Sequence, residues 1–188
     1  MMSEQLKLFL KLKKKKAEIE RAENQMLFKP AQKNINFHVL HTGKKYQIDD
    51  VNISCARMSH PGASYSYSVE ENGKKFVYAT DVELQSDSFE KNEEKKLVFE
   101  NADVLVLDSQ YTVEEAARKV NWGHSAFCYA IDFAVAWNIK KLYLFHHEPT
   151  YDDRKLYSIL ESAKWYSDYI TNGTVKVYLA IEGTEIRL

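Results

Sequence analysis

The hydrophobic pattern changes along the chain from a helical to a strand-like period. Residues 3 to about 27 place apolar side chains beside a charged face, which predicts an amphipathic helix that ends before Lys29-Pro30. From residue 35 onward the apolar runs are short, and several of them alternate with polar residues, as strands do. The predicted strands are 35–40, 46–48, 51–56, 65–70, 75–80, 104–107, 140–145, 175–180 and 184–188.

Helix signals fall between the later strands. The pattern predicts helices up to Glu100, from Thr112, from Ala126 to Trp137 and from about residue 151 to 169. Thr112 to Glu115 has the sequence of a capping box, and Ser125 is the expected N-cap of the helix that follows it. Strands that alternate with helices through short links predict an α/β (α+β) layered domain.

Composition narrows the class of protein. The chain has 188 residues, of which 45% are hydrophobic, and its net charge is −1, so we expect a folded domain without a global attraction to nucleic acids. No apolar run approaches the roughly 18 residues that span a bilayer, so we expect no membrane segment. Cys55 and Cys128 indicate reduced thiols, and we expect a cytoplasmic protein.

Candidate chemistry is concentrated where apolar runs stop. His60, Asp81, Asp108 and His146 each end or directly follow a strand-like run, before a loop. Strand ends hold side chains rigidly, and His and Asp are metal ligands. The Asn72-Gly73 hairpin returns the chain to the end of the sheet where it left His60, so we expect Asp81 beside His60.

Two of these residues have ordinary interpretations as well. Asp108 fits a third ligand-bearing strand end, but also a carboxylate that caps or salt-bridges a loop. His124 follows Gly123 at the start of a predicted helix, where an imidazole can meet an anionic group, or where it can be incidental. The residues themselves leave both alternatives open.

Five motifs, in order and in register over residues 51 to 188, resemble the metallo-β-lactamase-fold hydrolases, closest to the branch of tRNase Z and cyclic-phosphodiesterase-like enzymes. The motifs are Ser59-His60-Pro61-Gly62, Tyr78-Ala79-Thr80-Asp81-Val82-Glu83, Leu107-Asp108-Ser109-Gln110-Tyr111-Thr112, Trp122-Gly123-His124-Ser125 and Leu144-Phe145-His146-His147-Glu148-Pro149.

The resemblance implies a role for each matched residue. His60 and His146 resemble histidine ligands of two different metals, and Asp81 resembles the carboxylate that bridges them. His147 would lie in the layer behind the ligands, and Asp108 would orient its neighbours. His124 would contact the scissile phosphate or protonate the leaving group. The implied cofactor is a divalent metal, zinc or else manganese or iron, acting on a small-molecule or nucleotide phosphodiester.

One departure shapes the functional hypotheses. The family's His-x-His-x-Asp-His signature does not occur in the 188 residues, so we expect a partial metallo-β-lactamase-like fold: the second sheet with its helices. In domain terms, residues 1–30 would be a helix and residues 31–188 the C-terminal half of the domain. A separately encoded N-terminal half, a second copy of this chain in a homodimer, or residues 1 to 50 folded across it would cover the apolar face of the sheet.

Three functions stay open at this point. The first is a metal-dependent hydrolase that is incomplete or inactive as an isolated chain. The second is a catalytically dead remnant or interaction module that keeps the fold. The third is a single-metal or metal-free use of the sheet edge, such as anion binding at His124.

Overall fold

A computed structural model of the chain describes residues 37–188. Two compact units are distinguished among them: one contains residues 41–181 and Leu188, and the other contains residues 37–40 and 182–187. The described helices and strands all lie in the larger unit. The helix expected in residues 1–30 lies outside the described residues, so it stays a prediction, as does the boundary at residue 31.

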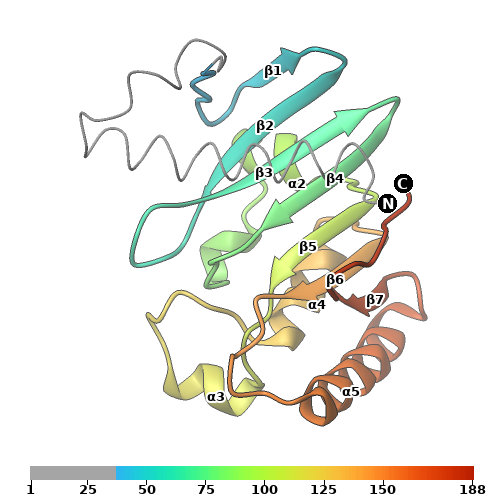
Figure 1. Ribbon diagram of the computed structural model, residues 1–188. Coiled ribbons are helices and arrows are strands. Elements are labelled where there is room, and N and C mark those ends of the chain that lie inside the picture. The colour runs from blue at the N-terminus through green and yellow to red at the C-terminus, as the bar shows by residue number, and fades with distance from the viewer. Residues whose placement is uncertain (1–36) are drawn as a thin grey trace. The chain divides into compact units, whose positions relative to one another are not determined.

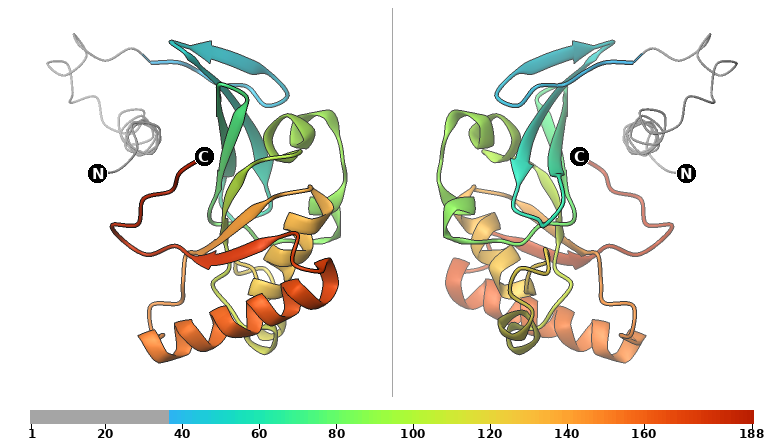
Figure 2. Two further views of the ribbon diagram at one scale, coloured as in Figure 1. Left: turned by 90° about the vertical axis from the view of Figure 1, so that its right-hand side faces the viewer. Right: turned by 90° about the vertical axis from the view of Figure 1, so that its left-hand side faces the viewer.

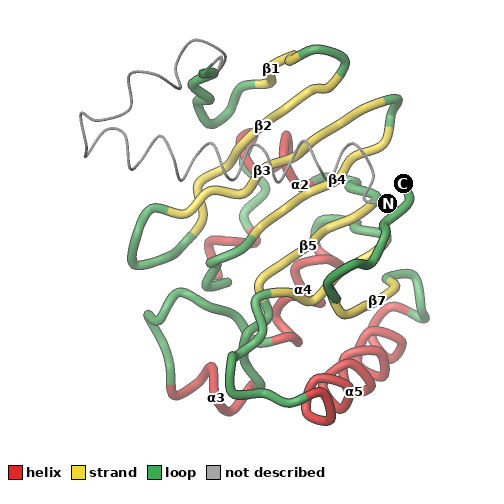
Figure 3. Tube along the Cα trace, viewed as in Figure 1, coloured by secondary structure: helices red, strands yellow, loops and turns green. Residues whose placement is uncertain are grey.

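The larger unit is built on one sheet of seven strands in sequential order (Figure 1). Four strands form an antiparallel meander, and the last three continue the sheet as parallel neighbours. The strands are β1 Lys45–Ile48, β2 Val51–Met58, β3 Ser64–Glu71, β4 Lys74–Ala79, β5 Val104–Asp108, β6 Lys141–Phe145 and β7 Lys176–Leu179. Figure 3 shows that loops leave and enter these strands at both of their ends.

The turn between β3 and β4 follows from its sequence. Asn72 and Gly73 take φ angles of 50° and 72°, the left-handed values that a two-residue hairpin turn requires. Asparagine and glycine tolerate this conformation better than other residues. The turn fixes the register in which Tyr67 lies opposite Tyr78.

The connections between the parallel strands place the helices on one face of the sheet (Figure 2). Parallel strands are joined by right-handed crossovers, and β4 to β7 progress in a single direction, so each crossover helix lands on the same side. The helical elements are η2 Ser86–Phe89, α2 Glu93–Phe99, α3 Val113–Arg118, α4 Phe127–Ala136 and α5 Asp153–Thr171.

The core lies between the sheet and these helices. Leu107 and Leu144 are fully buried and alternate with residues on the opposite face of their strands. Phe133 of α4 packs its ring edge-to-face on Phe99 of α2, with centroids 4.9 Å apart, and Trp137 is buried beside both rings. This aromatic group fixes α2 and α4 against the sheet.

The other face of the sheet is also rich in aromatic side chains. Tyr143 of β6 and Tyr178 of β7 are register partners, and their rings stack with centroids 4.9 Å apart. Tyr78 of β4 and Phe145 of β6 are within 5.6 Å by ring centroids. None of the helices described in residues 37–188 packs on this face (Figure 2).

The expected α/β class is confirmed, but three local predictions are wrong. Residues 37–40, the described part of the first predicted strand, and residues 184–188 contain no strand. Ser125 is not an N-cap: Ala126 holds that position, without a side-chain cap. The Ser125 hydroxyl instead donates to Val82 O at 2.6 Å and accepts from Leu84 N at 3.0 Å, so a tertiary contact replaces the local one.

The half-buried carboxylate of Glu115 joins α3 to the loop that precedes α5. The predicted capping box is present, and Glu115 accepts hydrogen bonds from the Thr112 amide and hydroxyl at 2.9 and 2.6 Å. The Tyr151 hydroxyl donates to the same carboxylate. Burial raises the pKa of Glu115, but the hydrogen bonds from Thr112 and Tyr151 outweigh it and lower the pKa to about 2.

This carboxylate predicts a pH dependence of stability. The folded pKa of Glu115, about 2, lies below its ordinary value of 4.5, so its contribution is complete above pH 4.5 and is lost as the pH falls toward 2. We expect Glu115→Gln to reduce the loss of unfolding free energy between pH 6 and pH 3, measured by urea denaturation. Glu161→Gln, a change at an exposed position of α5, should leave that loss unchanged. Equal losses in the parent and in Glu115→Gln would contradict the assignment.

Candidate functional site

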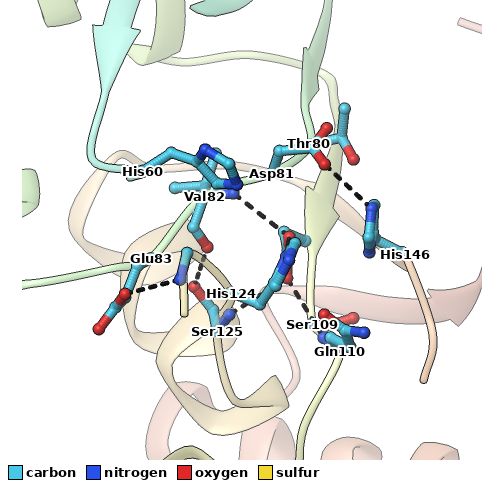
Figure 4. Close-up of polar contacts among 12 residues, drawn as sticks. His60, Thr80, Asp81, Val82, Glu83, Ser109, Gln110, His124, Ser125 and His146 are labelled. Atoms are coloured by element: carbon cyan, nitrogen blue, oxygen red, sulfur yellow. Dashed lines mark hydrogen bonds and ion pairs between the residues drawn. The ribbon is translucent and has the colours of Figure 1, made fainter. Parts of the chain in front are cut away.

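The strand-end residues meet at one edge of the sheet (Figure 4). Asp81 follows β4, Asp108 ends β5 and His146 follows β6, so the carboxyl ends of three parallel strands bring them together. His60 lies in the link from β2 to β3, which reaches the same edge because these strands run antiparallel to one another and β3 is antiparallel to β4. His124 arrives on the loop that precedes α4.

Asp81 and His146 form a strained pair. Their φ angles are 58° and 60°, a left-handed conformation that costs free energy in residues other than glycine. His146 Nε2 lies 3.1 Å from Asp81 Oδ1, and this hydrogen bond raises the pKa of His146, against the opposing effect of burial. Both left-handed turns bend the chain at the moment it leaves a strand, which directs the two side chains toward each other.

Asp108 is fully buried and accepts hydrogen bonds from several segments. Its Oδ1 receives the Ser125 amide at 3.1 Å and the Gln110 amide at 3.3 Å. Its Oδ2 receives the Val82 amide at 3.2 Å and lies 2.7 Å from His124 Nδ1. Since a carboxylate offers about four acceptor sites, these contacts use all of them. Asp108 therefore ties the backbone of three segments and the His124 ring together.

The contact with Asp108 determines how His124 is presented. A neutral imidazole that donates through Nδ1 keeps the lone pair of Nε2, so Nε2 is the atom available for a ligand or a proton. The His124 ring stacks on His146 with centroids 4.7 Å apart and meets the His60 ring edge-on at 5.7 Å. His124 therefore lies between the other two histidines (Figure 4).

Gly123 allows this close approach. Its φ angle is 93°, and a Cβ atom placed there would lie 2.3 Å from Cδ2 of His60 and 2.8 Å from Cδ of Pro61. A side chain at position 123 is excluded on both counts. The backbone of the loop before α4 is thus packed directly against the His60 ring.

His60, Asp81 and His124 supply ligand atoms that lie within 4.8 Å of one another. Two imidazoles and a carboxylate are the donor set of a catalytic zinc site, which uses three protein ligands and leaves a position open. Asp108, His124 and His146 form a second such group among residues 37–188, but Asp108 has no acceptor site left for a metal.

Further details show how a divalent metal fits these residues. Nδ1 of His146 is buried without a hydrogen-bond partner, so this ring has a nitrogen that the protein does not use and that could bind a metal. Nδ1 of His60 accepts the Gly62 amide at 3.0 Å, which places the proton of the neutral ring on Nε2. His60 must exchange that hydrogen bond or turn its ring to bind a metal. The donor set fits a divalent cation, with His60 as the ligand that rearranges.

Glu83 is a buried residue of the site to which the sequence assigned no role. Its two carboxylate oxygens accept the Asn121 and Gly123 amides, each at 2.8 Å. Asn121 and Gly123 are residue types that tolerate positive φ, so the sequence indicated a tight turn. It did not indicate that Glu83 would accept the amides of that turn.

Two further polar atoms near the site, His147 Nε2 and Gln110 Oε1, are buried without hydrogen-bond partners. Burial also lowers the pKa of His147.

Comparisons with known proteins agree with this architecture. Residues 7–147 match a protein family described as the beta-lactamase superfamily domain. The metallo-beta-lactamase fold protein YhfI from Bacillus subtilis superposes with a TM-score of 0.64 and 19% identity, over 89% of this chain and 61% of its own. No match was found among curated proteins.

Two further solved structures share the fold. The short form of human tRNase Z superposes with a TM-score of 0.51 and 18% identity, over 74% of this chain and 44% of its own. A diphosphatase from the PhnP family gives a TM-score of 0.52 and 17% identity, over 79% of this chain and 47% of its own. The chain thus spans 61% or less of the length of these three proteins. Within residues 37–188, the helices are too short or too polar to cross a membrane.

The hydrogen bonds of Asp108 predict the effect of a near-isosteric change. In Asp108→Asn an amide group replaces one acceptor oxygen, and its own N–H groups oppose the donors that remain. We expect the free energy of unfolding to fall by about 1–3 kcal/mol for each donor left without an acceptor. The His124 ring should also lose its fixed tautomer, which imidazole nitrogen chemical shifts measure.

The matched control for this change is Asp50→Asn, at an exposed position of the β1–β2 turn. It should change stability by less than about 0.5 kcal/mol and leave the His124 spectrum unaltered. If Asp108→Asn kept both parental stability and the parental His124 spectrum, Asp108 would have no orienting role.

Proposed function

Because the chain belongs to the beta-lactamase superfamily, we propose that it is a metal-dependent hydrolase whose substrates are phosphodiesters. The observation that carries the proposal is the convergence of His60, Asp81 and His124 at the sheet edge, with His124 held through Nδ1 by a buried carboxylate. This combination of ligand atoms and an oriented imidazole is suited to metal-assisted hydrolysis.

We assign metal binding to His60 and Asp81, which belong to one ligand group, and to His146, whose Nε2 lies 3.1 Å from Asp81 Oδ1. Zinc is the favoured ion, with manganese or iron as alternatives. When bound, such a cation polarises a phosphoryl oxygen and activates water as the nucleophile. Asp81 lies within hydrogen-bonding distance of His146 and in the same ligand group as His60. Its carboxylate is therefore the proposed ligand that is close to both histidines.

His124 is the residue that we assign to proton transfer. Asp108 holds its Nδ1, so Nε2 is the atom that faces the site; once Nε2 has taken up a proton, it can donate that proton to the oxygen that leaves phosphorus. Asp108 also stabilises the positive charge of the ring while that proton is held. His147, behind the ligands, is kept neutral by burial, which lowers its pKa.

The substrate class rests on chemistry and on likeness. Two of the structural matches are a tRNase and a diphosphatase by name, and both names indicate substrates that contain phosphate. An imidazole beside clustered ligands suits a leaving oxygen on phosphorus. We infer the phosphodiester class from these two points together.

We also propose that the isolated chain is an incomplete enzyme. The His-x-His-x-Asp-His signature is missing from its sequence, and the sheet has an aromatic face on which no helix of residues 37–188 packs. An N-terminal half supplied by a separate chain would add ligands and cover this face. A second copy of this chain is the other way to cover it, and the mass in solution separates the two.

The test is metal content by elemental analysis together with turnover of bis(p-nitrophenyl) phosphate. We expect one bound divalent ion per chain with little turnover by the chain alone. Asp81→Asn should reduce metal content at least tenfold because the shared ligand is lost. His124→Ala should keep the metal, because we assign His124 to proton transfer; loss of the metal would show that His124 is a ligand and contradict that assignment.

His41→Ala is the matched control, since His41 is exposed and lies outside the cluster. It should retain parental metal content. A chain that binds no divalent metal, or an Asp81→Asn variant that binds it as tightly as the parent, would overturn the proposed function and favour a fold retained without the site. Two bound ions with rapid turnover would overturn the incompleteness instead.

A further inference from the structure

Trp122 stands out at the rim of the site because it is large, apolar and 61% exposed. It directly precedes Gly123, whose backbone packs on the His60 ring, and it is two residues from His124. Burying an indole would stabilise the fold, but the exposed Trp122 ring does not contribute that free energy of burial. Exposure of a single apolar side chain is common, so the way in which this one is held decides its meaning.

The backbone around Trp122 is fixed on both sides. Asn121 and Gly123 adopt φ angles of 66° and 93°, and the Glu83 carboxylate accepts both of their amides at 2.8 Å. The Trp122 amide donates to Lys119 O at 3.1 Å. A nearly buried carboxylate and two left-handed residues therefore hold the indole at the tip of a rigid turn.

The surroundings of the indole favour a ligand that carries negative charge. Lys119 Nζ lies 5.5 Å from the Trp122 ring and 4.1 Å from the Tyr111 ring. Tyr111 in turn meets His124, with ring centroids 6.0 Å apart, so the ammonium lies between the exposed indole and the site. Lys119 also pairs with Glu148 Oε2 at 3.4 Å, which positions the ammonium and leaves it partly exposed.

We propose that Trp122 is a stacking platform for a nucleobase, and that the substrates of the proposed phosphodiesterase are therefore nucleotides. The proposal rests on the proposed function for the phosphate chemistry. The exposed indole on the rigid turn supplies the surface on which the base would stack. A pre-ordered aromatic surface loses little conformational entropy on binding, and base–aromatic stacking tolerates any base. Lys119 complements the charge of the phosphate that the base carries.

The test measures ligand binding without turnover. The chain has three tryptophans: Trp137 is fully buried, and exposed Trp165 lies on α5, stacked on Tyr169 with centroids 5.6 Å apart. In Trp165→Ala, adenosine monophosphate should quench the fluorescence of the remaining exposed indole with saturation. By calorimetry, Trp122→Ala should bind this nucleotide about 5- to 100-fold more weakly than the parent, and Trp165→Ala should bind it as the parent does.

Two comparisons make the result decisive. Ribose phosphate, which has the phosphate and no base, should bind the parent and Trp122→Ala equally. Trp122→Phe keeps an aromatic face and should retain most of the affinity, so a loss confined to Trp122→Ala cannot be attributed to misfolding. Circular dichroism verifies the fold of each variant.

Three outcomes would overturn the proposal: equal affinity of the parent and Trp122→Ala for the nucleotide, equal affinity of the parent for the nucleotide and ribose phosphate, or no nucleotide binding at millimolar concentration. Metal content separates this failure from that of the proposed function. A parent that holds its metal and shows any of these outcomes refutes the platform alone.

Discussion

The buried carboxylate of Asp108 connects the segments from which the candidate site is assembled. It ends β5 and accepts amides from the loop after β4, from its own strand end and from the loop before α4, and it also holds the His124 ring. A buried carboxylate is stable only if its acceptor sites are filled, so these loops must adopt the conformations that fill them. The desolvation cost of one charge thus imposes order on backbone that has no regular secondary structure.

Glu83 and Ser125 extend the same constraint. Glu83 accepts the amides on both sides of Trp122, and Ser125 joins the loop before α4 to the loop after β4 through two hydrogen bonds. The strained residue Asp81 directly precedes Val82, whose amide Asp108 accepts, so this network extends to that strained turn. Asp81 and His146, two of the proposed ligands, are already paired with each other in the protein, whereas His60 must exchange a hydrogen bond or turn its ring to bind a metal.

The sheet explains why such a site forms where it does. Parallel strands with right-handed crossovers bring all of their carboxyl ends to one edge and all of their helices to one face. The carboxyl ends of these strands bring Asp81, Asp108 and His146 together, and none of the helices described in residues 37–188 packs on the opposite, aromatic face. The proposed metal site, the nucleotide platform and the proposed need for a second sheet are consequences of this one topology.

Much of this architecture could be predicted from residue patterns. The apolar runs identified β2 to β7, Asn72-Gly73 identified the hairpin, and Thr112 identified the capping box, because each depends on contacts within a few residues. The placement of His60 beside Asp81 followed from the hairpin for the same reason. Residues 37–40 and 184–188 have a pattern that predicted strands, but among the described residues neither segment pairs with a strand.

The sequence by itself determined the α/β class, the order of the elements and the residue types at the strand ends, because periodicity and turn chemistry are local properties. Only the tertiary structure decided which side chains meet. The contacts of Asp108 with Val82, His124 and Ser125 join residues 16 to 26 positions apart. The hydrogen bonds from Ser125 to Val82 and from the amides of Asn121 and Gly123 to Glu83 join residues 38 to 43 positions apart. Such pairings depend on how buried polar groups satisfy one another in three dimensions, and no local pattern encodes that.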